Sequence, residues 1–470
     1  MISQNKLYKG LIWSTIEKIL IVAVQILIEI VLARFVSPKE YGIMGMLLII
    51  ISLSQVLVDS GLGSALIFKK DRSEIDFSTA FYASLAIGLF TYLLIFILAP
   101  YIAVFFKSDI VAYIRIISFT IIIGSTSIIY KTKLNIELDF KSQAKFSFFA
   151  ILISGVVGLV LAIGNFGVWA LVVQNILFSF LTLIFLIVNI GWYPKIVFSF
   201  QHFKSLFRYS SKLLYAGIFN AVYINLNSLL LGKFFPAKQL GYYTKSYQFT
   251  IFPASVFTNV IQRVLFPYYT ESQTDKSRLY DNTLKFNKII FILMMPIISI
   301  IILYAHPIIV LLLSDSWKSM VMPFQILLGA ILFYPLIVLN MNVFQVLGET
   351  SRYFWIEVIT KLLGIVILVL LYPYGINGIC IGIFVQFFFQ YLITSFFVGN
   401  ITGQNFFRSF NIILYLVIGG VFLFGLFKFR HPALIYDVLL IFVVIIFYSL
   451  FLFIILKKEI TFIYQKLLKK

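Results

Sequence analysis

The sequence is poor in charged side chains, which make up 12% of its 470 residues, whereas ordinary soluble domains carry about 25%. Its one cysteine, Cys380, lies inside an apolar run, so the chain has no disulfide framework. The three histidines, His202, His306 and His431, are far apart, and we therefore expect neither a metal cluster nor a catalytic histidine constellation. A phosphate-binding Gly-Lys-Ser/Thr loop is also missing, which argues against ATP hydrolysis.

What the chain has in excess is apolar sequence, at 61% of all residues. Runs of 18 or more apolar residues, each able to cross about 30 Å of hydrocarbon, recur along its whole length. Backbone groups in lipid must be satisfied internally, so these runs predict an all-α integral membrane protein. We predict about 14 transmembrane helices, at 11–33, 43–68, 77–106, 110–130, 145–165, 167–190, 210–234, 247–269, 285–313, 320–346, 352–372, 376–398, 409–427 and 433–456.

The net charge of +19 lies mainly in short loops between apolar runs, which is typical of membrane proteins and not of nucleic-acid binders. If the N-terminus is cytoplasmic, the cytoplasmic side carries 25 Lys and Arg residues and the far side 9. This bias predicts a multi-pass protein with both termini in the cytoplasm. The first apolar run has 23 residues and no small-residue cleavage site, so we expect a retained span and not a signal peptide.

The chain repeats itself in the same order. Leu32–Gly42 returns as Leu231–Gly241 at an offset of 199 residues, and Ala99–Asp109 returns as Ala305–Asp315 at an offset of 206. Spans 1–6 therefore correspond to spans 7–12. Because six is an even number, the two halves have the same orientation, which predicts a parallel repeat about an axis along the membrane normal.

This repeat divides the chain into two six-helix halves, a short linker and two further helices. The linker places aromatic and apolar residues on one helical arc and basic residues on the next, which favours an in-plane helix on the cytoplasmic surface. An ordinary basic loop is the alternative. The predicted divisions are 1–198, 199–212, 213–400 and 401–470.

A polar stripe follows the first span. Ser14, Lys18, Gln25 and Glu29 fall on one narrow arc, with Glu17 on a neighbouring face. The corresponding span of the second half carries Asn220, Tyr223 and Asn227 at helical spacing. Such faces line a cavity between the halves, or they hydrogen-bond across packed helices.

Charges within spans are costly unless they are paired or hydrated. Their depths, at about 1.5 Å per residue, match opposite charges in three candidate pairs. These are Lys18 with Asp59, Glu29 with Arg115, and Glu357 with Lys361. Each pair serves a transport site or merely fixes helix packing. The far-side loops have about 15 residues or fewer, too few for the acidic loops that a membrane glycosyltransferase needs, so we expect no enzyme.

The stretches Ala33–Gly42 and Asp59–Ile67, together with the six-plus-six-plus-two layout, resemble the polysaccharide repeat-unit flippases. These Wzx-type transporters share a superfamily and a fold with the multidrug and toxin extrusion proteins. The resemblance implies transport of undecaprenyl-diphosphate-linked oligosaccharides across the bacterial inner membrane, for O-antigen, capsule or exopolysaccharide synthesis. It implies no cofactor, and it implies a polysaccharide polymerase as a partner.

The resemblance also implies a cationic, hydrated central cavity. The candidate substrate-binding residues are Lys18, Gln25, Arg115, Asn220, Tyr223, Asn227 and Lys361. If transport is coupled to H⁺ or Na⁺, the candidate carboxylates are Glu17, Glu29 and Asp59. An ion-coupled multidrug exporter is the alternative function, but it would require a net acidic cavity for cationic drugs.

Overall fold

The computed structural model describes residues 21–59, 61–405 and 407–408, and these residues form helices joined by short connections, with no strand among them. Nine helical runs within these ranges are long and apolar enough to cross a membrane. This establishes the predicted all-α membrane class. The predicted spans at 409–427 and 433–456 lie outside the described residues, so the number 14 stays a prediction.

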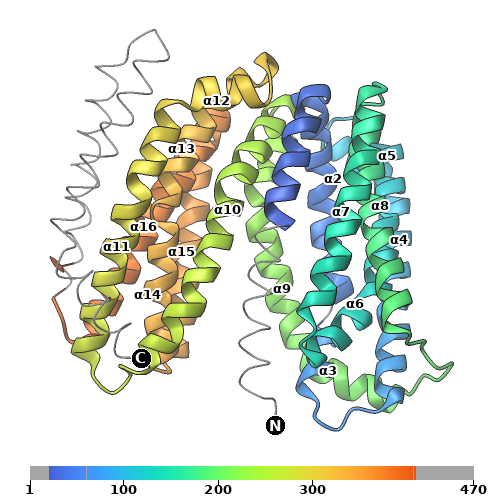
Figure 1. The fold of residues 1–470 in the computed structure, drawn as a ribbon, viewed down its shortest axis with the longest axis horizontal. Helices are drawn as coiled ribbons and strands as arrows, with labels where there is room; N and C mark the ends of the chain where they lie inside the picture. Colours follow the sequence, from blue (N-terminus) through green and yellow to red (C-terminus); the bar gives the residue numbers. More distant parts are fainter. Residues whose placement is uncertain (1–20, 60, 406, 409–470) are drawn as a thin grey trace. The chain divides into compact units, whose positions relative to one another are not determined.

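The described chain divides into two compact units (Figure 1). The first unit holds the chain through Lys245 and the segment Leu312–Trp317. Its first helix includes residues 21–35. The others are α2 (Pro38–Asp59), α3 (Leu62–Phe68), α4 (Glu74–Phe105), α5 (Val111–Ile117), α6 (Phe119–Glu137), α7 (Phe140–Ile163), α8 (Val168–Ile190), α9 (Phe200–Phe234) and the start of α10 (Ala237–Thr270).

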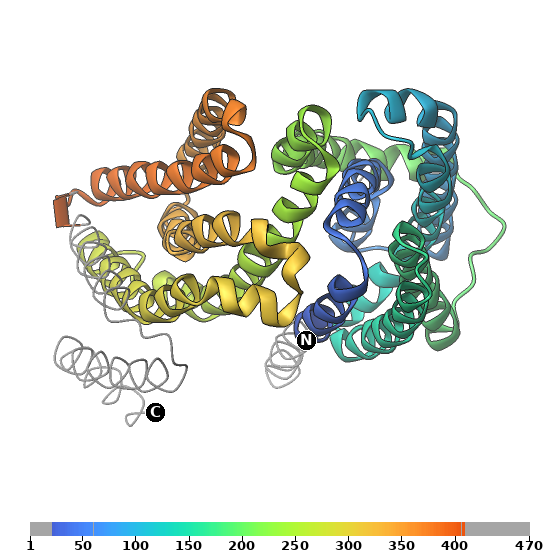
Figure 2. The same ribbon diagram turned by 90° about the horizontal axis from the view of Figure 1, so that it is seen from above.

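The second unit holds Ser246–Leu311 and the described chain from Lys318 onward. In it, α16 packs against α11, α13, α14 and α15 (Figure 2). Its elements are the rest of α10, α11 (Lys276–Leu303), α12 (Ala305–Leu312) through Leu311, the end of the 3₁₀ turn Asp315–Met320 from Lys318 onward, α13 (Val321–Ile331), α14 (Tyr334–Val346), α15 (Thr350–Leu371), a short 3₁₀ turn (Tyr372–Tyr374) and α16 (Gly375–Thr402).

Local capping sequences decide where several helices begin. At α2, the Glu40 carboxylate accepts a hydrogen bond from the Ser37 backbone N–H at 2.6 Å. The Ser37 hydroxyl accepts in turn from the Glu40 N–H at 3.4 Å. This reciprocal cap starts α2 at Pro38, five residues before the span predicted from hydropathy alone. Ser73 and Asp76 form the same box at the start of α4.

The start of α10 corrects the sequence-based prediction. Hydropathy placed this span at 247–269, with a loop before it, but the helix begins at Ala237. Ala237 corresponds to Pro38 at the offset of 199 residues, so the repeated stretches begin equivalent helices. Lys245 therefore lies eight residues inside a helix and is not a loop residue.

The predicted linker continues into the next span. Residues 200–234 form one uninterrupted helix, α9, whose start is capped by the Ser199 hydroxyl accepting from the His202 N–H. The His202 Nδ1 atom lies 2.6 Å from the buried Asp76 carboxylate, which also binds the Lys69 ammonium at 2.6 Å. These contacts tie the beginning of α9 to the beginning of α4. The division into halves at 198 and 213 stays a prediction.

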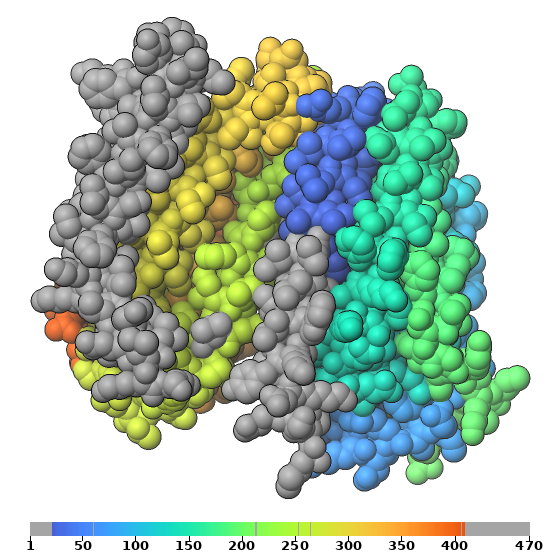
Figure 3. Space-filling view, in the orientation of Figure 1, coloured from blue at the N-terminus to red at the C-terminus, as the bar shows by residue number. Residues whose placement is uncertain are grey.

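The helix at 21–35 packs closely against α7. A Cβ atom at Gly155 would lie 2.5 Å from the Cδ1 atom of Ile28, so the absence of a side chain at Gly155 allows Ile28 to pack against α7. Figure 3 shows the surfaces of these two helices next to each other, the first in blue and α7 in teal. The contact fixes the helix that carries Gln25 and Glu29.

Candidate functional site

The two copies of the repeated stretch meet each other in the first unit. A Cβ atom at Gly42 would lie 1.7 Å from the Ala237 carbonyl oxygen, and one at Gly241 would lie 1.8 Å from the Pro38 carbonyl oxygen. Gly42 corresponds to Gly241, and Pro38 corresponds to Ala237. The contact is thus reciprocal, as a local twofold relation between the starts of α2 and α10 requires.

Substituting either glycine should be severely destabilising. A methyl group at Gly42 would overlap a backbone oxygen that cannot move without shifting α10, so Gly42→Ala should cost about 3 kcal/mol or more. Gly382→Ala is the matched control, because its nearest neighbour would be a side-chain atom at 3.5 Å. Thermal unfolding and membrane abundance of the two variants measure the difference. Equal behaviour would show that the crossing is not as close as described.

A charged cluster lies beside this crossing, formed by Glu29, Tyr41 and Lys245. The Lys245 ammonium makes an ion pair with the Glu29 carboxylate, and the Tyr41 hydroxyl donates to the same carboxylate at 3.1 Å. The ammonium also lies 3.8 Å from the centroid of the Tyr41 ring. Lys245 is 1% exposed. Such a buried charge is tolerated because the carboxylate and the ring compensate it.

A tryptophan from a distant part of the sequence packs against the cluster. Trp317 is fully buried and packs edge-on against Tyr41 and Tyr242. Its indole N–H donates to the Ala33 carbonyl at 2.8 Å, while the Tyr242 hydroxyl donates to the Ser316 carbonyl at 3.1 Å. The short segment 312–317 therefore belongs structurally to the first unit.

The predicted pairing of Glu29 with Arg115 is wrong. Glu29 binds Lys245, whereas the Arg115 guanidinium on α5 lies 4.4 Å above the Phe96 ring, with Nε 3.4 Å from the Phe96 carbonyl. Equal depth in the membrane was the basis of the prediction, and depth does not fix the direction in which a side chain points. Within the described ranges, no carboxylate lies within ion-pair distance of Arg115.

Asp59 is the last residue of α2, and its side chain is exposed. It accepts from the Gln55 amide at 3.2 Å, and the Lys131 ammonium on α6 acts on it electrostatically. Both Asp59 and Lys131 are exposed. Its predicted partner, Lys18, and the neighbouring Glu17 lie outside the described residues, so this pairing stays a prediction. Lys131 was not predicted, because it was assigned to a loop.

The third predicted pair is present. Glu357 and Lys361 lie one turn apart on α15 in the second unit, with their charged atoms 3.3 Å apart. Both side chains are partly exposed, at 30% and 21%. The spacing of four residues was sufficient to predict this pair, because it places the two side chains on one face of a helix.

The remaining predicted site residues lie on two helices of the first unit. Gln25 is half-buried on the helix at 21–35, and on α9 Asn220 is exposed while Tyr223 and Asn227 are half-buried. Their roles stay predictions. Lys245, like Lys131, is a site residue that sequence reasoning missed. The repeat contained the signal, because it aligns Lys245 with Met46, a residue well inside α2.

These features define a multi-span, all-helical membrane protein with charges buried inside its helices. Solved structures with the same fold include "Lipid II flippase MurJ, inward closed conformation", with a TM-score of 0.75, 16% identity, and coverage of 96% of this chain and 100% of that one. An inward-facing multidrug resistance MATE family transporter matches with a TM-score of 0.61 and 16% identity, over 83% of this chain and 98% of that one. At this identity the likeness concerns the fold.

The family described as "Polysaccharide biosynthesis protein" matches residues 31–322, and the chain belongs to this family. "Teichuronic acid biosynthesis protein TuaB" of Bacillus subtilis (strain 168) is 22% identical over 67% of this chain and 66% of its own length. "Succinoglycan biosynthesis transport protein ExoT" of Rhizobium meliloti (strain 1021) is 24% identical over 65% and 62%. "Lipopolysaccharide biosynthesis protein WzxC" of Escherichia coli (strain K12) is 23% identical over 69% and 66%. The matched region spans just under two thirds of each relative.

Proposed function

We propose that the protein moves lipid-linked oligosaccharides from the cytoplasmic to the periplasmic leaflet of the bacterial inner membrane. The family match over residues 31–322 carries this proposal, and relatives with printed names in teichuronic acid, succinoglycan and lipopolysaccharide synthesis each match about two thirds of the chain. The proposed cargo is an oligosaccharide on undecaprenyl diphosphate. Its polar head cannot cross about 30 Å of hydrocarbon unaided, whereas its polyprenyl tail can stay in lipid.

Basic side chains within apolar helices support an anionic cargo. Lys131 is exposed on α6, Arg115 has only an aromatic ring and a backbone carbonyl as described partners, and Lys361 is partly exposed on α15. A diphosphate offers such cations charge-assisted hydrogen bonds, which are stronger than those between neutral groups. The same residues would repel cationic drugs, so we do not favour a multidrug exporter.

Transport would follow alternating access, with the Glu29–Tyr41–Lys245 cluster holding one end closed. The cluster joins the helix at 21–35 to α10 at the crossing of Gly42 and Gly241. In the predicted topology, with both termini cytoplasmic, this is the periplasmic end. Opening that end would require the buried pair to separate and become hydrated. Because this separation costs free energy, the closed and open forms would be two distinct states.

Ion coupling and assembly are part of the same proposal. Glu29 is held by Lys245, whereas Asp59 is exposed beside Lys131, so we assign coupling to H⁺ or Na⁺ to Asp59 and not to Glu29. We also propose that a polysaccharide polymerase receives the cargo on the far side. Transport and not catalysis is the activity, and within the described ranges no group of acidic, histidine or cysteine side chains could hold a metal ion.

Deleting the gene should trap the cargo on the cytoplasmic side. Lipid-linked oligosaccharide is expected to accumulate several-fold and to resist a membrane-impermeant glycosidase added to intact spheroplasts, because the head group stays inside. Complementation with the intact gene is the control and should restore digestion. Unchanged, outward-facing oligosaccharide combined with new sensitivity to cationic drugs would contradict the proposal and favour the multidrug exporter.

A further inference from the structure

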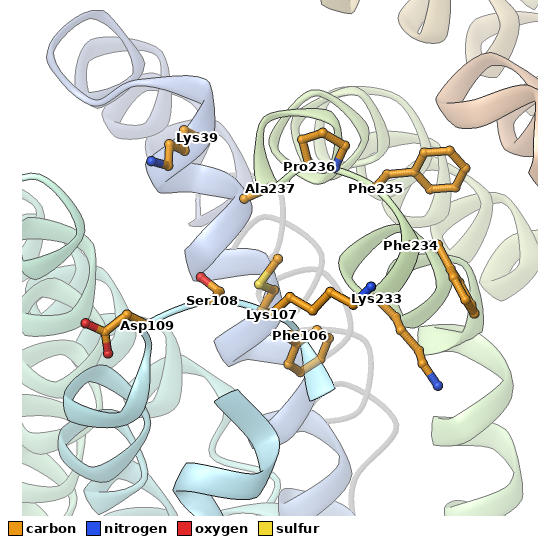
Figure 4. A pocket seen from close by; sticks show the side chains of 11 residues that line it. Lys39, Phe106, Lys107, Ser108, Asp109, Lys233, Phe234, Phe235, Pro236 and Ala237 are labelled. Carbon is orange, nitrogen blue, oxygen red and sulfur yellow. The ribbon is translucent and has the colours of Figure 1, made fainter. Parts of the chain in front are cut away.

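The first unit has an open cavity of about 500 Å³ close to the crossing of α2 and α10. Its lining comes from the first turn of α2, the connection between α4 and α5, and the connection between α9 and α10 (Figure 4). The residues that matter for its chemistry are Lys39, Lys107, Asp109, Lys233, Pro236 and Ala237. We call this the lysine cavity. It is separate from the Glu29–Tyr41–Lys245 cluster, none of whose residues line it.

Because the sequence is repeated, the lysine cavity has an equivalent place in the first unit, formed by the other copy of each repeated stretch. Its lining residues Lys233 and Phe106 correspond to Arg34 and Leu312. At that equivalent place the Arg34 guanidinium donates to the Leu312 carbonyl at 2.9 Å.

The same equivalent place also holds the buried Trp317, whose own counterpart at the offset of 206 residues is Val111. This equivalent corner therefore holds a tryptophan and an arginine that is bonded to a backbone carbonyl. The lysine cavity has Lys233 in place of that arginine, and Val111, the counterpart of Trp317, does not line it.

Three lysines from three separate segments surround the cavity. Lys39 and Lys107 are exposed, and Lys233 is half-buried with its ammonium 4.5 Å from the centroid of the Phe105 ring. In Figure 4 the Lys107 side chain extends toward Lys233, the Lys233 side chain points toward Phe234, and Lys39 lies apart from both. Asp109 supplies one opposing charge. The lining is therefore net cationic, which favours an anionic occupant.

The backbone at Lys107 is also unusual. Lys107 has a φ of 50° and follows the C-cap residue of α4, where glycine is usually preferred. A residue with a side chain costs about 1 kcal/mol in this conformation relative to glycine. Lys107 lines the cavity, and strained positions of this kind concentrate at binding sites.

The start of α10 adds a further attraction for an anion. Ala237, the first residue of α10, lines the cavity, and Pro236 precedes it. In the corresponding position before α2, Ser37 caps the helix with its hydroxyl. Proline has no side chain that could do so. The Gln239 N–H, the counterpart of the Glu40 N–H, donates instead to the Pro236 carbonyl at 2.9 Å, and helix N-termini favour negative charge.

We propose that the lysine cavity is a binding site for the phosphate group of an amphiphile. The lysines and the start of α10 would bind the phosphate oxygens, and the exposed aromatic residue Phe234 in the lining would contact the apolar chain. The phosphate comes from a lipid-linked diphosphate or from a membrane phospholipid, which share this chemistry. The lipid-linked source rests on the proposed function, whereas binding of a membrane phospholipid does not.

A thiol placed in the cavity reports binding at this site alone. Cys380 is the only native cysteine and is fully buried, so a Cys380→Ala background is free of other thiols. In that background Ser108→Cys places a thiol in the lining, and Lys145→Cys on α7 is the exposed control outside it. The purified full chain is kept in a neutral, phosphate-free detergent, because phosphatidylcholine would itself offer a phosphate to the site. Maleimide labelling is timed with decyl diphosphate, dihexanoyl phosphatidylglycerol or the neutral decyl maltoside.

We expect one or both phosphate amphiphiles to slow labelling of Ser108→Cys several-fold, with no effect on Lys145→Cys and none from decyl maltoside. Adding Lys39→Gln, Lys107→Gln and Lys233→Gln should raise the concentration of phosphate amphiphile that is needed for protection by about tenfold or more, since charge-assisted hydrogen bonds are lost. The control triple Lys70→Gln, Lys145→Gln and Lys195→Gln, which removes the same charge elsewhere, should change it little.

Asp109→Asn provides a test that misfolding cannot mimic. Removing the one opposing charge should lower the concentration of phosphate amphiphile needed for protection. Protection by decyl diphosphate alone identifies the carried diphosphate as the source, and protection by phosphatidylglycerol identifies a membrane lipid. Equal protection by decyl maltoside, no protection at all, or no response to both the triple variant and Asp109→Asn would overturn the proposal.

Discussion

Replacing Lys245 with methionine should destabilise the protein by roughly 3–5 kcal/mol, because the Glu29 carboxylate would be left largely buried without its cation. Methionine fits the space, since Met46 occupies the corresponding position of the repeat in α2. We expect a lower unfolding temperature and a depleted membrane pool. Lys238→Met makes the same chemical change at an exposed position two turns earlier in α10 and should shift stability by less than about 0.5 kcal/mol.

The double variant separates structure from function at this cluster. Glu29→Gln with Lys245→Met leaves no unpaired charge, so abundance should return to near the wild-type level. If the pair holds one end of the transporter closed, export per protein should remain impaired, because the closed state has lost its electrostatic contribution. Polymer export is measured against membrane abundance for each variant. Full export by the double variant would show that the pair is structural only.

Most of the fold could be predicted because it depends on local and compositional rules. Apolar length and the requirement for internal hydrogen bonding are sufficient to predict membrane helices. The pair Glu357–Lys361 was predictable for the same reason, since four residues of helix fix the two side chains on one face. These inferences need no knowledge of how distant helices are arranged.

The partner of Glu29 could not be predicted in this way. Depth along the membrane is one coordinate, and Arg115 matched it without facing Glu29. The true partner was hidden by an error of ten residues in the start of α10, which hydropathy missed because the first turns of that helix are polar. The repeat would have corrected it. Applying the capped start of α2 to its copy places Lys245 inside the helix.

Arg115→Gln should reduce export by about tenfold or more while leaving membrane abundance close to wild type. Arg115 has no carboxylate partner in the described part of the chain, so its removal leaves no buried charge uncompensated. The substitution should therefore weaken the binding of an anionic ligand and not the stability of the protein. Losing one charge-assisted hydrogen bond to a phosphate accounts for about a tenfold loss of export. Arg115→Lys keeps the charge but loses the planar fork, and should retain part of the activity.

Lys361 provides the contrasting case, because its partner is known. Lys361→Gln alone leaves Glu357 unpaired, and Glu357→Gln with Lys361→Gln removes both charges of a pair that is 3.3 Å apart. If Lys361 serves only Glu357, the double variant should restore export and abundance together. If it binds the diphosphate, abundance should return while export stays low. We expect the second result, measured as polymer export per protein in cells. Full export by this double variant, together with full export by Arg115→Gln, would leave the cationic cavity without support and make these charges determinants of helix packing.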